Sequence, residues 1–154
     1  VELISPGVNV NKKIYPNSCV LSAMHNKIEG ADGLVSKVET HIYEAANAAR
    51  IMFSEIGGDF AKCLVDEEKN SQDQGVVLFF SYVNLASPWV GEAAAELQRR
   101  RYFFGGAFPR WFDGAGFMLQ RLLCPADFEV MVLIHDDAKQ LFEIIRKDWE
   151  QTFA

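Results

Sequence analysis

The chain has 154 residues, of which 49% are hydrophobic and 23% are charged, as is typical of a globular protein with a buried core. The net charge of -6 and a pI near 5.0 argue against nucleic-acid binding, which needs clustered Lys and Arg side chains. No apolar run approaches the roughly 20 residues of a membrane span, so we expect one domain over residues 1–154 that binds no membrane.

The N-terminal third combines an irregular segment with a predicted helix. Residues 1–33 are punctuated by Pro and Gly, and "SPGVNVNKKI" and "CVLSAM" are possible short strands within them. From Leu34 to Ala49 the pattern predicts a helix, because apolar residues recur at spacings of three and four. These residues are Leu34, Val38, Ile42, Ala45, Ala46 and Ala49.

The next segment, "ARIMFSEI", fits either an extension of that helix or a strand with alternate residues on one face. Gly57 and Gly58 end either element. Asp59 is then expected to cap a short helix, "DFAKCLVDEEKN", and "NSQDQG" to form a polar loop. The predicted inward-facing residues of this helix are Phe60, Cys63 and Leu64.

The clearest strand of the chain is "VVLFFSYVNL", a β-branched and aromatic run that ends before Pro88. A helix is predicted from about Trp89 to Arg101, and the arginines at its end suit a solvated helix C-terminus. Two strands follow, over residues 103–111 and 116–123, and Asp113-Gly114 supplies the turn between them.

The C-terminal region reads as a strand followed by a helix. "FEVMVLI" has the composition of a strand, and "HDDAKQLFEIIRKDW" has one apolar helical face with Asp136 or Asp137 as its cap. Helices and strands alternate along the whole chain, which predicts an α/β or α+β fold with helices packed on a sheet.

Cysteines and histidines show no spacing typical of a disulfide framework or a metal site, so no metal is expected. Reduced thiols in a cytoplasmic protein are the expectation. The residues concerned are Cys19, Cys63, Cys124, His25, His41 and His135.

One stretch carries a family resemblance. Ala94 and Leu97 match the helix pattern N-x-x-A-x-x-L-Y-x-K-x-G-F, and the hairpin "GGAFPRWFDGAGFMLQRLL" follows it. Residues 76–123 therefore resemble the C-terminal half of the GNAT N-acetyltransferase superfamily, and "YFFGGAFPRWFDGAGFMLQRLL" resembles a divergent GNAT-like domain of larger bacterial proteins. With the residues just upstream, the resemblance covers about half to two-thirds of the chain. It implies a GNAT-like mixed central sheet flanked by helices, with an extra C-terminal helix.

The resemblance also implies a loop that binds the pyrophosphate of CoA through backbone N–H groups, with the pattern Q/R-x-x-G-x-G/A. "SEIGGD" stands at that position, with Ser54 in place of Gln or Arg and Asp59 in place of the second small residue. Because a carboxylate there repels a diphosphate, the loop is degraded. If acetyl-CoA or another acyl-CoA binds, the candidate residues are Gly57, Gly58 and Asn84.

The proton donor that the resemblance implies is a tyrosine on the helix, and Gln98 occupies that position. A glutamine cannot act as a general acid. Tyr102 is a possible substitute, although a core aromatic is the more ordinary interpretation of Tyr102 and of Tyr82. The candidate catalytic residues are accordingly Tyr102 and Gln98.

Three functions remain open from the sequence. The chain is either a GNAT-like binding or regulatory module that has lost its chemistry, or an active acyl-CoA-dependent N-acyltransferase. The third possibility is an unrelated small α/β interaction domain, with Trp89, Trp111 and Trp149 as a partner surface. The expected partner is another protein or a larger parent protein, and a homodimer is possible.

Overall fold

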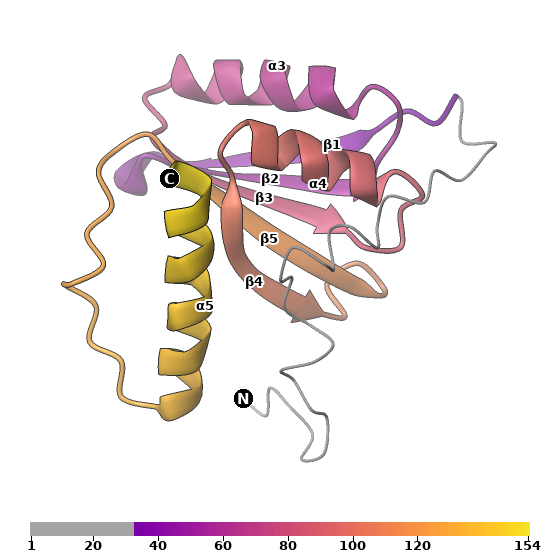
Figure 1. Ribbon diagram of the computed structural model, residues 1–154. Helices are drawn as coiled ribbons and strands as arrows, with labels where there is room; N and C mark the ends of the chain where they lie inside the picture. Colours follow the sequence, from indigo (N-terminus) through magenta and orange to yellow (C-terminus); the bar gives the residue numbers. More distant parts are fainter. Residues whose placement is uncertain (1–32) are drawn as a thin grey trace.

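The structure, a computed structural model, describes residues 33–154, and the two possible strands at "SPGVNVNKKI" and "CVLSAM" lie outside this range. Five strands form one sheet in the order β1-β2-β3-β5-β4 (Figure 1). β2 and β3 are parallel, and the other neighbouring pairs are antiparallel. The elements are β1 (Lys37–Tyr43), the 3-10 helix η1 (Glu44–Ala46), β2 (Ala48–Glu55), α3 (Phe60–Gln72), β3 (Leu78–Asn84), α4 (Val90–Arg99), β4 (Phe103–Pro109), β5 (Ala115–Leu122) and α5 (Asp136–Phe153).

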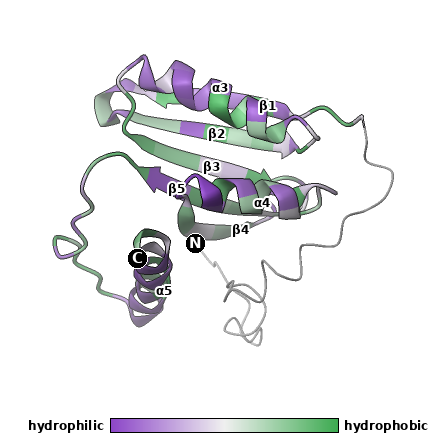
Figure 2. Ribbon diagram, turned by 45° about the horizontal axis from the view of Figure 1, so that its top comes forward, coloured by the Kyte–Doolittle hydropathy of each residue, from purple (hydrophilic) through white to green (hydrophobic). Residues whose placement is uncertain are grey.

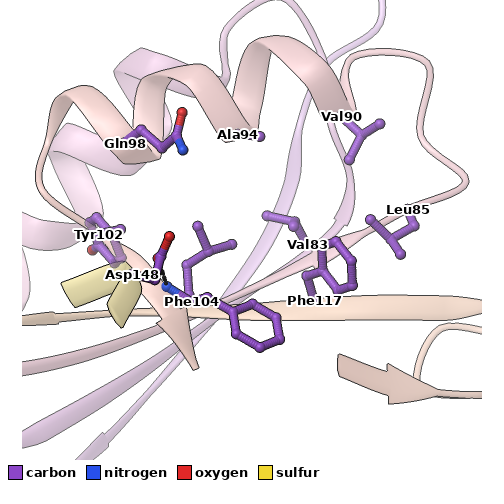
Figure 3. Close-up of a pocket in the computed structure, with 10 residues that line it drawn as sticks. Val83, Leu85, Val90, Ala94, Gln98, Tyr102, Phe104, Phe117 and Asp148 are labelled. Carbon is purple, nitrogen blue, oxygen red and sulfur yellow. Dashed lines mark hydrogen bonds between the residues drawn. The ribbon is translucent and has the colours of Figure 1, made fainter. Parts of the chain in front are cut away.

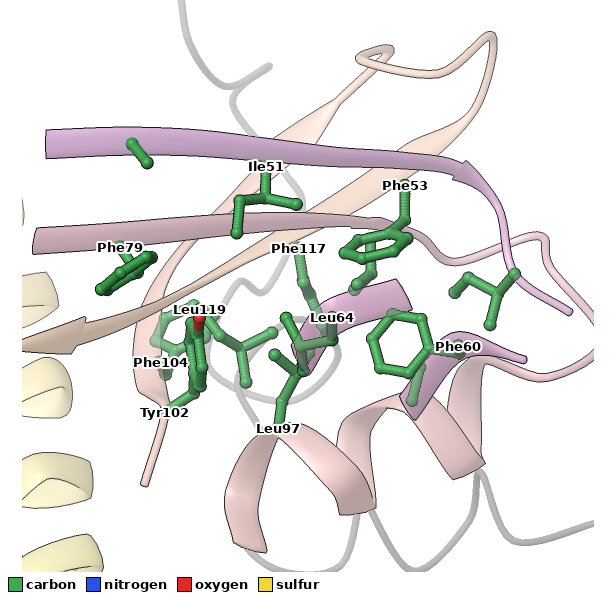
Figure 4. Close-up of a cluster of buried hydrophobic side chains, with 14 of the residues drawn as sticks. Ile51, Phe53, Phe60, Leu64, Phe79, Leu97, Tyr102, Phe104, Phe117 and Leu119 are labelled. Atoms are coloured by element: carbon green, nitrogen blue, oxygen red, sulfur yellow. The ribbon is translucent and has the colours of Figure 1, made fainter. Parts of the chain in front are cut away.

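The predicted fold class is confirmed: a mixed sheet is flanked by helices, with an additional helix at the C-terminus. Helices α3 and α4 lie side by side over one face of the sheet, and α5 packs beside the edge strand β4 (Figure 1). Hydrophilic and hydrophobic residues alternate along these helices, as expected for helices with one face on a core (Figure 2). The core lies between α3, α4 and the sheet (Figure 4), and its most deeply buried apolar residues include Ile51, Phe53, Leu64, Phe79, Leu97 and Tyr102.

The predicted helix over residues 34–49 is wrong, because this segment contains strand β1, the short η1 and the start of β2. Val38 and Ile42 are four residues apart, and that spacing suits both one face of a helix and one face of a strand. In the structure every second residue of β1 is partly buried, and Val38 and Ile42 pack against the core. Pairing with β2 decides between the two interpretations, and of the two readings of "ARIMFSEI" the strand is correct.

The predicted strand at "FEVMVLI" is also wrong. The segment between β5 and α5 contains a turn and irregular backbone, and Val132 and Ile134 have exposed fractions of 89% and 82%. β-branched side chains favour a strand only where a neighbouring strand supplies hydrogen bonds and packing. No strand of the described residues pairs with this segment.

The remaining elements agree with prediction apart from their ends. α3 continues through Gln72, so part of the predicted polar loop is helical. Asp136 and Asp137 lie in the first turn of α5, and the cap position belongs to His135. The turn between β4 and β5 includes Asp113 with φ of 54°, in the left-handed region that Asp tolerates.

A buried ion cluster joins the helical layer to the sheet. Glu68 on α3 is 1% exposed, and its carboxylate accepts hydrogen bonds from Arg100 and from Arg121 of β5. Arg100 is therefore not a solvated residue of the helix end, because its side chain is only 28% exposed. The hydrogen bond that Arg100 donates to the Glu68 carboxylate raises the pKa of Arg100 above its ordinary value.

Candidate functional site

A small pocket lies where the parallel strands β2 and β3 end. Backbone pairing between them stops at Phe53 and Val83, and a pocket of 170 Å³ opens just beyond. Ligands of open α/β sheets commonly bind outside the carboxyl ends of parallel strands. The lining residues are Leu34, Ser54, Glu55, Ile56, Asn84, Ala86, Ser87 and Pro88.

The backbone N–H groups of the loop between β2 and α3 are already hydrogen-bonded within the chain. Ile56 N–H donates to the Ser87 hydroxyl at 3.1 Å, and Gly57 N–H donates to the Ser36 hydroxyl at 2.9 Å. Gly58 N–H donates to the Leu34 carbonyl at 3.1 Å. A phosphate would have to displace these protein acceptors to reach the same three donors.

Gly57 and Gly58 differ sharply in their surroundings. A Cβ atom on Gly57 would lie 2.1 Å from the Leu34 carbonyl oxygen, whereas a Cβ atom on Gly58 would have no atom within 4 Å. Gly57 is thus required for the close approach of the segment that precedes β1. That segment lies against the very position at which the resemblance expects a free anion-binding loop.

Asp59 occupies the cap position of α3, as predicted, but its side chain does not cap the helix. Its carboxylate accepts a hydrogen bond from Ser36 N–H at 2.8 Å, and the Cys63 thiol donates to it at 3.5 Å. The hydrogen bonds from Ser36 lower the pKa of Asp59. A negative charge is therefore favoured on this loop, which further disfavours an anionic ligand beside it.

Asn84 lines the same pocket, but its side-chain amide forms hydrogen bonds with backbone groups of the protein itself. The amide nitrogen donates to the Ser54 carbonyl at 3.1 Å, and the amide oxygen accepts from Ala86 N–H at 2.9 Å. The side chain thereby bridges β3 to the end of β2, where direct strand pairing has ceased.

Gln98 and Tyr102, the candidate catalytic residues, line a different cavity from Asn84 and the loop. This cavity lies between α4, the sheet and Asp148 of α5, and its walls are mainly apolar (Figure 3). Its volume of 20 Å³ is about enough for one water molecule. The structure therefore does not bring the two sets of candidate residues to one cavity.

Tyr102 is enclosed by the protein. Its exposed fraction is 0%, and burial, followed by the neighbouring Glu68 carboxylate, raises its pKa well above the ordinary value. Both effects oppose ionisation of the hydroxyl. The burial also separates this hydroxyl from any substrate that approaches from solvent.

A larger basin lies on the sheet face opposite α3 and α4, and the sequence did not indicate it. Ile51 and Phe53 of β2 face the core, so the alternate residues Arg50 and Met52 point to the other face. The basin has a volume of 400 Å³, and its lining residues are Glu39, Arg50, Met52, Ser54, Trp111 and Phe112. The lone arginine in the apolar run "ARIMF" is the one sequence signal that could have found it.

Comparison with known proteins found no protein-family model and no curated protein that matches this chain. Within residues 33–154, no group of three His, Cys, Asp or Glu side chains is arranged to hold a metal ion. No helix in that range combines the length and apolar composition that crossing a membrane requires.

Proposed function

We propose that this chain is a GNAT-like domain that serves as a binding or regulatory module and does not transfer acyl groups. The order of its elements supports the proposal: a strand, a helix, a second strand parallel to the first, a helix and a closing hairpin. This is the order that the sequence resemblance implies for residues 48–122.

The proposed loss of acyl transfer rests on the loop between β2 and α3, whose backbone N–H groups are already hydrogen-bonded within the chain. The N–H groups of Ile56, Gly57 and Gly58 all donate to acceptors of the chain itself. A CoA pyrophosphate has its highest affinity where such donors are free and gathered at a helix N-terminus. Leaving the internal acceptors unpaired would cost about 1–3 kcal/mol for each buried group.

Calorimetric titration with CoA and acetyl-CoA tests the proposal. We expect no saturable heat of binding up to about 1 mM ligand. A Kd of about 1 mM would correspond to a binding free energy of only about 4 kcal/mol. The amide NMR signals of Gly57 and Gly58 should also stay in place when the ligand is added. Micromolar binding, with displacement of those two signals, would overturn the proposal.

One observation favours the second candidate, an active acyl-CoA-dependent N-acyltransferase. The 170 Å³ pocket lies at the ends of β2 and β3, just beyond their last paired residues, where a thioester could be bound. In that case Gly57, Gly58 and Asn84 would bind acyl-CoA, and release of free thiol from acetyl-CoA in the presence of amines would be measurable. Gln98 and Tyr102 would not supply the proton, since both line the separate cavity beside α5.

A further inference from the structure

We infer that the 400 Å³ basin on the open face of the sheet binds a small planar ligand that carries one carboxylate. Arg50 supplies the positive charge of this basin and Trp111 its flat wall. The volume lies within the range of about 300–1,000 Å³ that is common for small-molecule sites. The inference does not depend on CoA binding or on the proposed loss of acyl transfer.

Arg50 is a half-buried cation that has no counterion among the residues that the structure describes. Among residues 33–154 it forms no ion pair, and its Nε is buried without a hydrogen-bond acceptor. Its guanidinium lies 5.9 Å from the centre of the Tyr43 ring, a cation–π contact that satisfies none of its N–H donors. A planar fork of N–H donors matches a carboxylate in two-point geometry.

The aromatic wall of the basin, Trp111, packs against two other aromatic side chains. Trp111 stacks on Tyr82 at 5.2 Å with an interplanar angle of 21°, and Phe108 lies 5.5 Å from Trp111. The turn between β4 and β5 is thereby attached to the sheet beside Arg50. Trp111 nevertheless remains 42% exposed, so part of its surface is available to a flat apolar ligand.

Glu39 limits the charge of the ligand. It lies on the rim of the same basin, on β1, and forms no ion pair with the described residues. A second negative charge on the ligand would meet this carboxylate, and like charges repel. The arrangement therefore favours a monoanion over a dianion or a phosphate.

Benzoate is a suitable probe, and benzamide is its uncharged counterpart of the same shape. Titration of the isotope-labelled protein is expected to shift the Trp111 indole N–H signal saturably with benzoate, with a Kd of about 1 mM for so small a ligand. The indole signals of Trp89 and Trp149 should stay in place. Benzamide should bind at least about tenfold more weakly, because it cannot form the charge-assisted pair.

Arg50→Gln is expected to weaken benzoate binding about tenfold or more, and Arg99→Gln, on the opposite layer of the molecule, to leave it unchanged. Should Arg50→Gln fail to give a dispersed spectrum, Arg50→Lys replaces it, with weaker binding expected because the two-point geometry is lost. Equal binding of benzoate and benzamide, or no saturable shift at about 20 mM benzoate, would overturn the inference. Because CoA binding is followed at Gly57 and Gly58, the two proposals fail independently.

Discussion

The Ser87 hydroxyl forms two hydrogen bonds with Ile56: it accepts from the backbone N–H at 3.1 Å and donates to the carbonyl oxygen at 3.2 Å. The two residues are 31 positions apart, and both are buried. One side chain thus replaces the strand pairing that ends at Phe53 and Val83. The contact holds the ends of β2 and β3 together beside the candidate pocket.

Ser87→Ala should lower the free energy of unfolding by about 1–3 kcal/mol, because it leaves a buried donor and a buried acceptor unpaired. Urea denaturation measures the change. Ser54→Ala is the control, since the Ser54 side chain is exposed, and it should change stability by less than about 0.5 kcal/mol. Equal stability of the two variants would show that the Ser87 bridge contributes little.

Gly57→Ala and Gly58→Ala form a matched pair of neighbours. A methyl group at Gly57 would overlap the Leu34 carbonyl, so we expect a loss of about 1–3 kcal/mol. A methyl group at Gly58 enters open space and should be neutral or slightly stabilising. Thermal or urea unfolding of both variants provides the comparison, and a tolerated alanine at Gly57 would contradict the closed loop.

Glu68→Gln should be one of the most destabilising polar substitutions in the described part of the chain. It leaves Arg100 and Arg121 partly buried without their carboxylate, and removal of one partner from a buried ion pair commonly costs about 3–5 kcal/mol. Glu67→Gln, one position away and without an ion pair among the described residues, is the control. Similar urea midpoints for both variants would argue against the role of the ion cluster.

Asp148→Asn should change how stability depends on pH. Burial raises the pKa of Asp148, and the hydrogen bond from Phe104 N–H only partly opposes that shift. The folded state therefore binds the proton more tightly than the unfolded state. The stabilising contribution of this group is complete below its unfolded pKa and is lost as pH rises through its folded pKa.

An asparagine at this position keeps an oxygen acceptor for Phe104 N–H but cannot ionise. We expect the Asn variant to match the original protein in acid and to exceed its stability at neutral pH. Unfolding free energies from about pH 3 to pH 7 report the difference. If the Asn variant were more stable than the original protein only in acid, the raised pKa of Asp148 would be contradicted.

Where the sequence predicted the secondary structure correctly, the local pattern is compatible with only one type of element. The continuous β-branched and aromatic run of β3, the turn at Asp113-Gly114 and the amphipathic α4 each agree with a single type of element. The segment of β1 fits two, since residues four apart share a face in both a helix and a strand. Its true state depends on β2 as a hydrogen-bonding partner.

For the candidate site too, some properties follow from the sequence alone and others only from the tertiary structure. The sequence alone determined that Glu55 and Asp59 place negative charge beside Gly57 and Gly58, because the charge of a side chain is a local property. Only the tertiary structure decided that the loop donors are occupied, since Gly57 meets Ser36 and Ile56 meets Ser87 across 21 and 31 residues of chain. The basin around Arg50 and Trp111 likewise exists only once β2 and the distant β4–β5 turn share one face of the sheet.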